Sequence, residues 1–351
     1  MRFVAYAALL LLAAAVGCRH LVTSGQSEIS EAEKKRLLAK TFSPEELGVR
    51  LVTRNGQSSA RWTELVSAPG AVRIPLARPD SQGSFQPLVP AKLNGRPAGA
   101  MVLDTGAPVT LVHGKLALQT GVRILNPDRL GNTFRGIGGE EKTFFGVCES
   151  LAVGPLEFQN VLAAIRTEEY RHKLLNVVSL SGWQGNLIGL SSLSRLAYVT
   201  IDYPAGHVIF EPDAEFPPPM RNIAQAPFKL EDLEIHLPIT INGQHVFQAL
   251  VDTGSDATLM INTNMVRALG LEMMIEHGKP GRFVGLGGDF TSRTFQLGEI
   301  KLGQTTFRLV DAATAPDDYP LTIGSGFFHR FKTTLDFKRK LLWLEKSAAT
   351  P

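Results

Sequence analysis

From about residue 71 to the end of the chain, short apolar runs alternate with turn-forming residues. The runs are rich in Val, Ile, Leu, Phe and Thr, and Gly, Pro, Asn and Asp separate them. Short strands joined by tight turns give this pattern, whereas amphipathic helices would repeat apolar residues every three or four positions. The sequence therefore predicts an all-β fold, with short helices only near Leu116, at 190–196 and at 264–269.

Residues 18–70 are more polar and contain two helix-start signals. Ser30 precedes Glu33 in the spacing of a capping box, and Ser43 stands before Pro44 and two glutamates. We interpret the segment as a spacer with short helices. The alternative is a prosegment that covers the functional site through its basic side chains, Lys34, Lys35, Arg36 and Arg50.

Residues 1–17 are typical of an export signal, with Arg2 before an apolar stretch over 4–16. This stretch is too short to span a bilayer. The segment that ends in Gly17 and Cys18 resembles a bacterial lipoprotein box, which implies a lipid on Cys18. Because Arg19 follows, we expect anchoring in the outer membrane facing the periplasm of the bacterial cell envelope. Ordinary secretion is the alternative.

Composition excludes several classes of function. The chain has 351 residues, of which 44% are hydrophobic, so it can bury a large core. Its formal net charge of +3 is spread without a basic stripe, and we expect no nucleic-acid partner. The histidines lack metal-ligand spacing, so no metal site is expected. Cys148 is the one cysteine left after Cys18, and its apolar surroundings predict a small buried residue.

The most informative feature is an internal repeat. Asp104-Thr105-Gly106 and Asp252-Thr253-Gly254 each close an apolar run, and an Asn-Gly pair precedes each at the same distance. Four landmarks recur in one order at nearly equal spacing, which indicates two copies of one module. We expect a first lobe at 71–215, a Pro-rich linker at 216–221, a second lobe at 222–347 and a tail at 348–351.

Together these motifs resemble those of aspartic proteases, and specifically a retroviral-type (retropepsin-like) protease dimer fused into one chain. The resemblance covers roughly residues 72–346. It implies a bilobal fold of two β-barrel-like lobes related by a pseudo-twofold axis, with Asp104 and Asp252 as the catalytic pair in the cleft. The loop residues that support the pair are Thr105, Gly106, Thr253, Gly254 and Ser255, and Gly189 and Gly324 are expected to brace the loops from behind.

Two carboxylates brought together at such an axis cannot both ionise easily, so they share one proton. The charged member can then activate a water while the protonated member hydrogen-bonds to the peptide carbonyl. This chemistry requires no metal or cofactor. A hydroxyl on Ser255, where the first lobe has Ala107, would favour the charged form of its neighbour. We therefore expect Asp252 to be the resting base and Asp104 the resting acid.

Two glycine-rich segments resemble the flaps that close over substrate in this family. They comprise Gly136, Ile137, Gly138 and Gly139 in the first lobe, and Gly285, Leu286, Gly287 and Gly288 in the second. The alternative is a pair of hairpin turns with no lid role. Asp256 stands where the retroviral pattern has an aspartate that binds substrate backbone, although it could equally be a surface carboxylate.

The sequence thus predicts an aspartic endopeptidase that acts on peptide or protein substrates, is anchored to a membrane through Cys18, and works as a monomer because both halves of its site lie in one chain. The alternative is a non-catalytic peptide-binding protein on the same fold.

Overall fold

The computed structural model describes residues 22–54, 57–77, 84–128, 133–136, 139–174, 178–183, 185–285 and 288–348. Cys18 and the expected signal therefore lie outside the described residues. Within the described part, no helix combines the length and the apolar character needed to cross a membrane.

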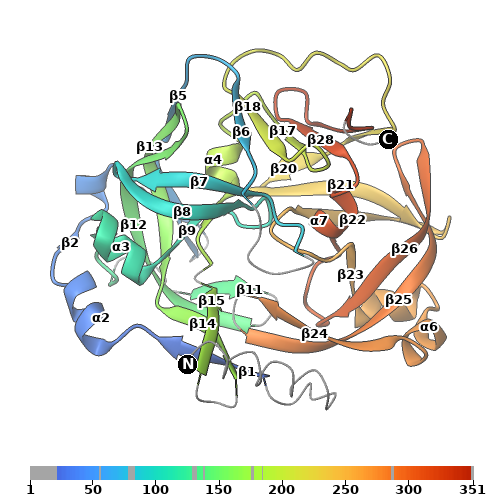
Figure 1. Ribbon diagram of the computed structural model, residues 1–351, viewed down its shortest axis with the longest axis horizontal. Helices are drawn as coiled ribbons and strands as arrows, with labels where there is room; N and C mark the ends of the chain where they lie inside the picture. The colour runs from blue at the N-terminus through green and yellow to red at the C-terminus, as the bar shows by residue number, and fades with distance from the viewer. Residues whose placement is uncertain are drawn as a thin grey trace, which may run out of the picture.

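Two β-rich lobes lie side by side, and a third sheet joins them (Figure 1). The first-lobe sheet contains β2 (Thr41–Phe42), β5 (Leu65–Ser67), β7 (Leu88–Leu93), β8 (Arg96–Leu103), β9 (Thr110–His113), β10 (Arg123–Leu125), β11 (Thr133–Gly136), β12 (Gly139–Val153), β13 (Leu156–Arg166) and β16 (Leu187–Ile188). The second-lobe sheet contains β20 (Lys229–Glu231), β21 (Glu234–Ile241), β22 (His245–Asp252), β23 (Leu259–Asn262), β24 (Lys279–Gly285), β25 (Gly288–Leu302), β26 (Thr305–Ala315) and β27 (Thr322–Gly324). The predicted all-β bilobal fold is confirmed.

The sheet between the lobes takes three strands from each half of the chain. They are β6 (Val72–Pro75), β17 (Tyr198–Asp202), β18 (His207–Glu211), β19 (Ala224–Pro227), β28 (Lys332–Asp336) and β29 (Leu341–Glu345). At its centre β17 and β28 run antiparallel with Thr200 opposite Thr334, and their hydroxyls are 2.7 Å apart. Because these two threonines are equivalent in the repeat, the pseudo-twofold axis passes between them.

The paired Asn-Gly turns feed the aspartate strands as predicted. Asn94 and Asn242 have φ angles of 49° and 48°, and each is followed by a glycine that also has positive φ. Two successive residues with positive φ suit the twist of a β-hairpin. Each asparagine side chain also accepts a hydrogen bond from the neighbouring strand, from Ser150 N in one lobe and Glu299 N in the other.

Short helices occur where the pattern placed them. They are α3 (Gly114–Thr120), α4 (Leu190–Leu193) and α5 (Thr263–Ala268), together with α7 (Ser325–Phe328), the counterpart of α4. The pattern did not predict α6 (Glu272–Glu276), whose Met273 and Met274 are 70% and 38% exposed. Without a buried apolar face, α6 has no helical periodicity for sequence reasoning to detect.

The N-terminal segment packs onto the first lobe, a contact that the spacer interpretation did not include. Its elements are β1 (Val22–Glu28), α2 (Glu31–Leu37), the 3-10 turn η1 (Glu45–Leu47), β3 (Arg50–Arg54) and β4 (Gln57–Arg61). The expected capping box of Ser30 and Glu33 is present at α2. However, Leu37, Leu47 and Val49 are buried, and β2 and β5 extend the first-lobe sheet. The apolar residues of this segment stand among charged ones, so its sequence pattern does not indicate a buried face.

The first half also carries a hairpin that has no counterpart among the described residues of the second half. It consists of β14 (Glu168–Leu174) and β15 (Val178–Trp183), and β1 adds a third strand to it along β14. The small sheet lies at the same side of the molecule as β11 and β24 (Figure 1). The N-terminal segment therefore reaches the side on which the glycine-rich hairpins lie.

Cys148 is fully buried within the first-lobe core. Burial raises the pKa of its thiol to about 12, so the thiol stays protonated at neutral pH. A packing role, as predicted, agrees with this environment.

Candidate functional site

Asp104 and Asp252 lie side by side where the two lobes meet. Asp104 follows β8 and Asp252 ends β22, and both side chains are half-buried. Their carboxyl groups are hydrogen-bonded to each other. The repeat therefore brings together two carboxylates that are far apart in the sequence, as the pattern predicted.

Backbone N–H groups of each loop hold its own aspartate. Gly106 N and Ala107 N donate to Asp104 Oδ1 at 2.8 and 3.1 Å, and Gly254 N donates to Asp252 Oδ1 at 2.9 Å. Such bonds fix the carboxylate orientation and favour its charged form.

The two threonines tie the loops to one another across the axis. Thr105 Oγ1 donates to Val251 O at 2.7 Å and accepts from Thr253 N at 3.1 Å. Thr253 Oγ1 makes the same pair of bonds to Leu103 O and Thr105 N, at 2.6 and 3.1 Å. Both threonines are buried, so the four bonds lock the relative position of the lobes at the site.

Glycine is required in both loops because the opposite aspartate lies against it. A Cβ added to Gly106 would lie 2.4 Å from Asp252 Cγ, and one added to Gly254 would lie 2.4 Å from Asp104 Cγ. Any side chain at either position would therefore separate the two carboxyl groups. The close approach of the two lobes is therefore the reason that both motifs carry glycine at this position.

Burial raises the pKa of both aspartates. Backbone N–H groups oppose burial at both carboxyls, from Gly106, Ala107 and Gly254 at Asp104 and from Gly254 and Ser255 at Asp252. For Asp252 the negative charge of Asp104 adds to the effect of burial. We therefore expect Asp252 to hold the proton that the pair shares and Asp104 to be the charged member at rest.

This assignment differs from the one expected from Ser255, which stays a prediction. The Ser255 hydroxyl accepts a hydrogen bond from Ala257 N at 3.3 Å, within its own loop. The charge of Asp104 acts on Asp252 through the short distance between the two carboxyl groups, which residue identity does not show.

Gly189 and Gly324 lie directly against the backbone of the loops that follow the two aspartates, and their bracing role stays a prediction. A Cβ on Gly189 would lie 2.3 Å from Val109 O, and one on Gly324 would lie 2.4 Å from Ala257 O. The helices that follow continue the contact, since Leu190 N donates to Ala107 O and Ser325 N donates to Ser255 O, both at 2.8 Å.

The glycine-rich segments form the tips of two β-hairpins. Gly136 pairs with Gly139 between β11 and β12, and Gly285 pairs with Gly288 between β24 and β25. Ile137, Gly138, Leu286 and Gly287 lie outside the described residues. The structure thus gives the hairpins, and their role as lids stays a prediction.

The two hairpins are anchored to their lobes by different chemistry. In the first lobe, Glu141 of β12 and Arg166 of β13 form a buried ion pair with an N–O distance of 2.6 Å. In the second lobe the matching positions are Phe290 and Ala315. There Phe290 and Phe283 stack with ring centroids 5.6 Å apart and pack on a cluster that includes Tyr319.

Asp256 contacts the protein's own chain. Its Oδ1 accepts bonds from Ser84 Oγ at 3.0 Å and from Phe85 N at 2.6 Å, and Gln86 Nε2 donates to Gly254 O. These residues precede β7 of the first lobe, so Asp256 links the two lobes. Its predicted contact with substrate backbone is untested.

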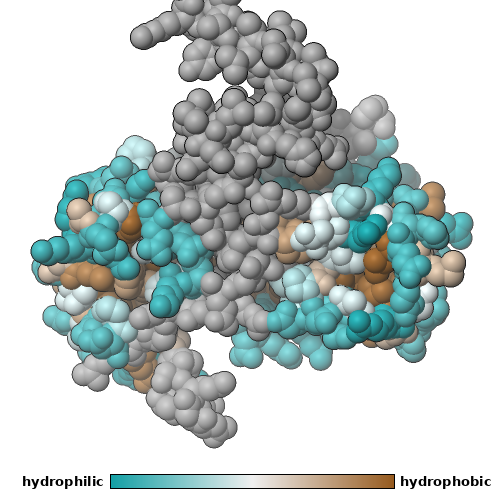
Figure 2. All heavy atoms as spheres, turned by 90° about the horizontal axis from the view of Figure 1, so that it is seen from below, coloured by the Kyte–Doolittle hydropathy of each residue, from teal (hydrophilic) through white to brown (hydrophobic). Residues whose placement is uncertain are grey.

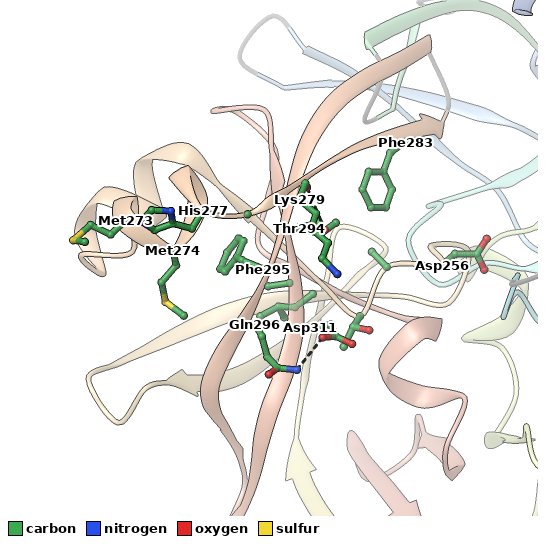
Figure 3. A pocket seen from close by; sticks show the side chains of 16 residues that line it. Asp256, Met273, Met274, His277, Lys279, Phe283, Thr294, Phe295, Gln296 and Asp311 are labelled. Atoms are coloured by element: carbon green, nitrogen blue, oxygen red, sulfur yellow. Dashed lines mark hydrogen bonds between the residues drawn. The ribbon is translucent and has the colours of Figure 1, made fainter. Parts of the chain in front are cut away.

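A cavity of about 860 Å³ opens beside Asp256 within the second lobe. Figure 3 shows Asp256 at one end and Met273, Met274 and His277 of the α6 region at the other, with Phe283 and Phe295 between them. Lys279 and the hydrogen-bonded pair Gln296 and Asp311 add polar groups to the wall. In the view of Figure 2, hydrophobic residues also reach the surface on this lobe, among mainly hydrophilic ones.

Sequence reasoning missed several residues of the site. Arg166, Tyr203, Tyr319 and Ser325 carry no recognisable motif. A comparison of the two repeats could have pointed to Arg166 and Ser325. The equivalent residue in the other copy is Ala315 for Arg166 and Leu190 for Ser325, and both are apolar.

Comparisons with known proteins found one matching sequence family and several similar structures. The sequence model of a family described as "Aspartyl protease" matches residues 89–183 and 237–327, once in each lobe. A retropepsin-like aspartic protease from Rickettsia conorii aligns at 18% identity and a TM-score of 0.29, over 35% of this chain and 89% of its own. An aspartic proteinase from Irpex lacteus aligns at 11% identity and a TM-score of 0.46, over 80% of this chain and 98% of its own. No curated protein matches the chain. Because the two family matches together cover more than half of the sequence, the chain belongs to the aspartyl protease family.

Proposed function

We propose that this protein is an aspartic endopeptidase whose Asp104 and Asp252 activate a water for attack on a peptide bond. Family membership supports peptidase activity in general. The observation that carries the finer proposal is the hydrogen-bonded pair of carboxyl groups held by two equivalent loops.

In the proposed mechanism Asp104 accepts a proton from the water as the water attacks the peptide carbonyl carbon. The protonated Asp252 donates a hydrogen bond to the carbonyl oxygen as negative charge develops there. Collapse of the tetrahedral intermediate then breaks the C–N bond, and a proton held by the pair passes to the leaving nitrogen. Both halves of the site come from one chain, which supports activity as a monomer.

We further propose that substrates are extended peptides with an apolar side chain on the second-lobe side. The cavity beside Asp256 supports this, because Met273, Met274, Phe283 and Phe295 line a space large enough for bulky side chains. Peptides that differ only in the residue facing this cavity should be cleaved with kcat/KM values that rise with apolar volume. Replacing Met274 with Glu should reduce that preference.

The decisive experiment incubates the purified chain with a mixed peptide library at several pH values, with Asp104→Asn as the matched control. Cleavage that the control lacks and that a statine-type inhibitor blocks supports the proposal. Saturable binding without cleavage by the unaltered chain would instead indicate a peptide-binding protein.

We also propose a lipid anchor on Cys18 and an outer-membrane location facing the periplasm. The support is the lipoprotein-like box that ends at this cysteine. Metabolic labelling with a fatty-acid analogue should mark the unaltered protein and spare Cys18→Ser. Labelling of both, or of neither, would contradict the anchor.

A further inference from the structure

Behind the Asp252 loop, two hydroxyl groups form a chain of hydrogen bonds. Ser325 Oγ, at the start of α7, lies 2.7 Å from Thr253 O. Tyr203 OH, from the turn after β17, lies 3.0 Å from Ser325 Oγ. Ser325 is fully buried. Tyr203 belongs to the first half of the chain, so the contact crosses between the halves.

The direction of the chain follows from the donors available. Thr253 O is a carbonyl oxygen and can only accept, so the Ser325 hydroxyl must donate to it. That hydroxyl has a single hydrogen, and Tyr203 OH is therefore the donor to Ser325 Oγ. Burial raises the pKa of Tyr203, so the phenol keeps the proton that it donates.

The peptide that receives this bond is the one that holds Asp252. Its carbonyl belongs to Thr253, and its N–H belongs to Gly254 and donates to Asp252 Oδ1 at 2.9 Å. A hydrogen bond accepted by the carbonyl polarises the peptide and strengthens the bond donated by its N–H. The chain therefore runs from Tyr203 through Ser325 and the peptide to the carboxyl of Asp252.

The first lobe has an apolar version of the same arrangement. Leu190 stands at the position of Ser325, because Leu190 N and Ser325 N donate to equivalent carbonyls, Ala107 O and Ser255 O. Phe337 stands at the position equivalent to Tyr203. Tyr203 directly follows β17 and Phe337 directly follows β28, and these two strands pair symmetrically about Thr200 and Thr334. Neither Leu190 nor Phe337 can donate a side-chain hydrogen bond to the Asp104 loop.

We propose that Tyr203 and Ser325 are positioning residues that polarise the Thr253–Gly254 peptide toward Asp252 and so make the two aspartates chemically different. This inference rests on the proposed function for its effect on catalysis, while the contact itself does not. Because the polarised N–H favours charge on Asp252, it assists the departure of the Asp252 proton. The relay thus keeps Asp252 from becoming too weak an acid to donate late in the reaction.

Other charged groups near Asp252 oppose or modify this effect. Asp104 and Asp256 are carboxylates on the facing loop and on its own loop. The charge on Asp252 is also felt by the Tyr319 phenol on the segment before β27. His329 ends α7, where its Nδ1 lies 2.8 Å from Gly326 O and burial lowers its pKa, so it adds little positive charge at neutral pH.

The test compares the full-length protein with Ser325→Ala and Tyr203→Phe by two readouts. One is the pH dependence of kcat/KM on a cleaved peptide. The other is a carbon-13 NMR titration of protein labelled at the aspartate carboxyl carbons, with the Asp252 signal assigned by its loss in Asp252→Asn. The NMR readout needs no turnover, so it distinguishes failure of the relay from failure of the proposed peptidase activity.

In Ser325→Ala, both the alkaline limb of the pH profile and the Asp252 titration should move upward by roughly 0.5 pH unit or more. Tyr203→Phe should move them in the same direction by less. The matched control is Ser191→Ala, because Ser191 is a buried serine of α4 whose hydroxyl makes no hydrogen bond within the described part of the chain. It should leave both readouts in place.

Titrations that superimpose in Ser325→Ala and the unaltered protein would overturn the relay, as would an equal shift in Ser191→Ala. If Ser325→Ala does not fold, Tyr203→Phe decides the question, because it removes one hydroxyl from a side chain that otherwise keeps its packing.

Discussion

The buried ion pair between Glu141 and Arg166 gives the sharpest stability prediction. Both side chains are almost completely excluded from solvent, at 2% and 0% exposure, and Arg166 Nε and Nη2 both bond the Glu141 carboxylate. Glu141→Gln keeps the shape of the side chain but removes its charge. The Arg166 guanidinium would then remain buried without its main counter-ion.

Removing one partner of a buried pair costs about 3–5 kcal/mol. Glu168 lies near enough that Arg166 affects its titration, and this second carboxylate can offset part of the loss. We therefore expect about 3 kcal/mol, which is a large share of the roughly 5–15 kcal/mol by which domains are stable. Urea unfolding at neutral pH, followed by circular dichroism, measures the change.

Two controls isolate the cause. Glu299 and Arg308 form an exposed pair at 3.9 Å in the second lobe, and Arg308→Gln there should change the stability by less than about 1 kcal/mol. Replacing Glu141 with Leu and Arg166 with Met together removes both charges and should be less damaging than Glu141→Gln alone. A loss below about 1 kcal/mol in Glu141→Gln, or a double variant that is worse than the single, would refute the reasoning.

Three further predictions concern the site itself. Replacing Asp104 with Asn should lower kcat for peptide cleavage by roughly 10²–10⁴-fold or more with little change in fold, and retained turnover would exclude its role as base. The pKa of Asp252 is higher in the folded protein than in the unfolded chain. Between these two pKa values the native state binds more protons than the unfolded chain, so the free energy of unfolding should fall as pH rises through that range. Asp252→Asn should flatten that dependence in urea unfolding measured from acid to neutral pH, and parallel curves would contradict the assignment. Thr253→Val leaves the buried Thr105 N–H and Leu103 carbonyl without a partner, and it should destabilise the protein by about 2–5 kcal/mol in the same assay, whereas a change within error would mean that the interlobe bonds are dispensable.

The repeat made much of this protein predictable. Asp104 and Asp252 could be paired from their positions in the chain, because equal spacing from the same Asn-Gly turns implies equal places in two copies of one fold. The alternation of short apolar runs and turn residues predicted strands, and Gly189 and Gly324 were predicted as braces from their place in the repeat. Whether a short segment forms a strand or a turn depends mainly on its own residues, so the sequence alone predicts it.

The features that the sequence did not reveal depend on contacts between distant segments. Residues 22–70 resemble a spacer because their few apolar residues stand among charges, yet Leu47 and Val49 are buried against the first lobe. The raised pKa of Asp252 depends on burial and on the nearby charge of Asp104, which residue identity does not encode. The link from Tyr203 to Ser325 crosses from one half of the chain to the other.

By itself, then, the sequence determined that two equivalent β lobes each present an Asp-Thr-Gly loop, because local pattern and internal repetition are properties of the chain alone. Only the tertiary structure decided how the lobes differ: an ion pair anchors one hairpin and stacked phenylalanines the other, and hydroxyls support one aspartate loop where the equivalent positions of the other lobe carry Leu190 and Phe337. The physical reason is that hydrogen bonds, burial and charge act through distances in space, and they can join residues far apart in the chain, as Tyr203 and Ser325 are, or Thr105 and Thr253.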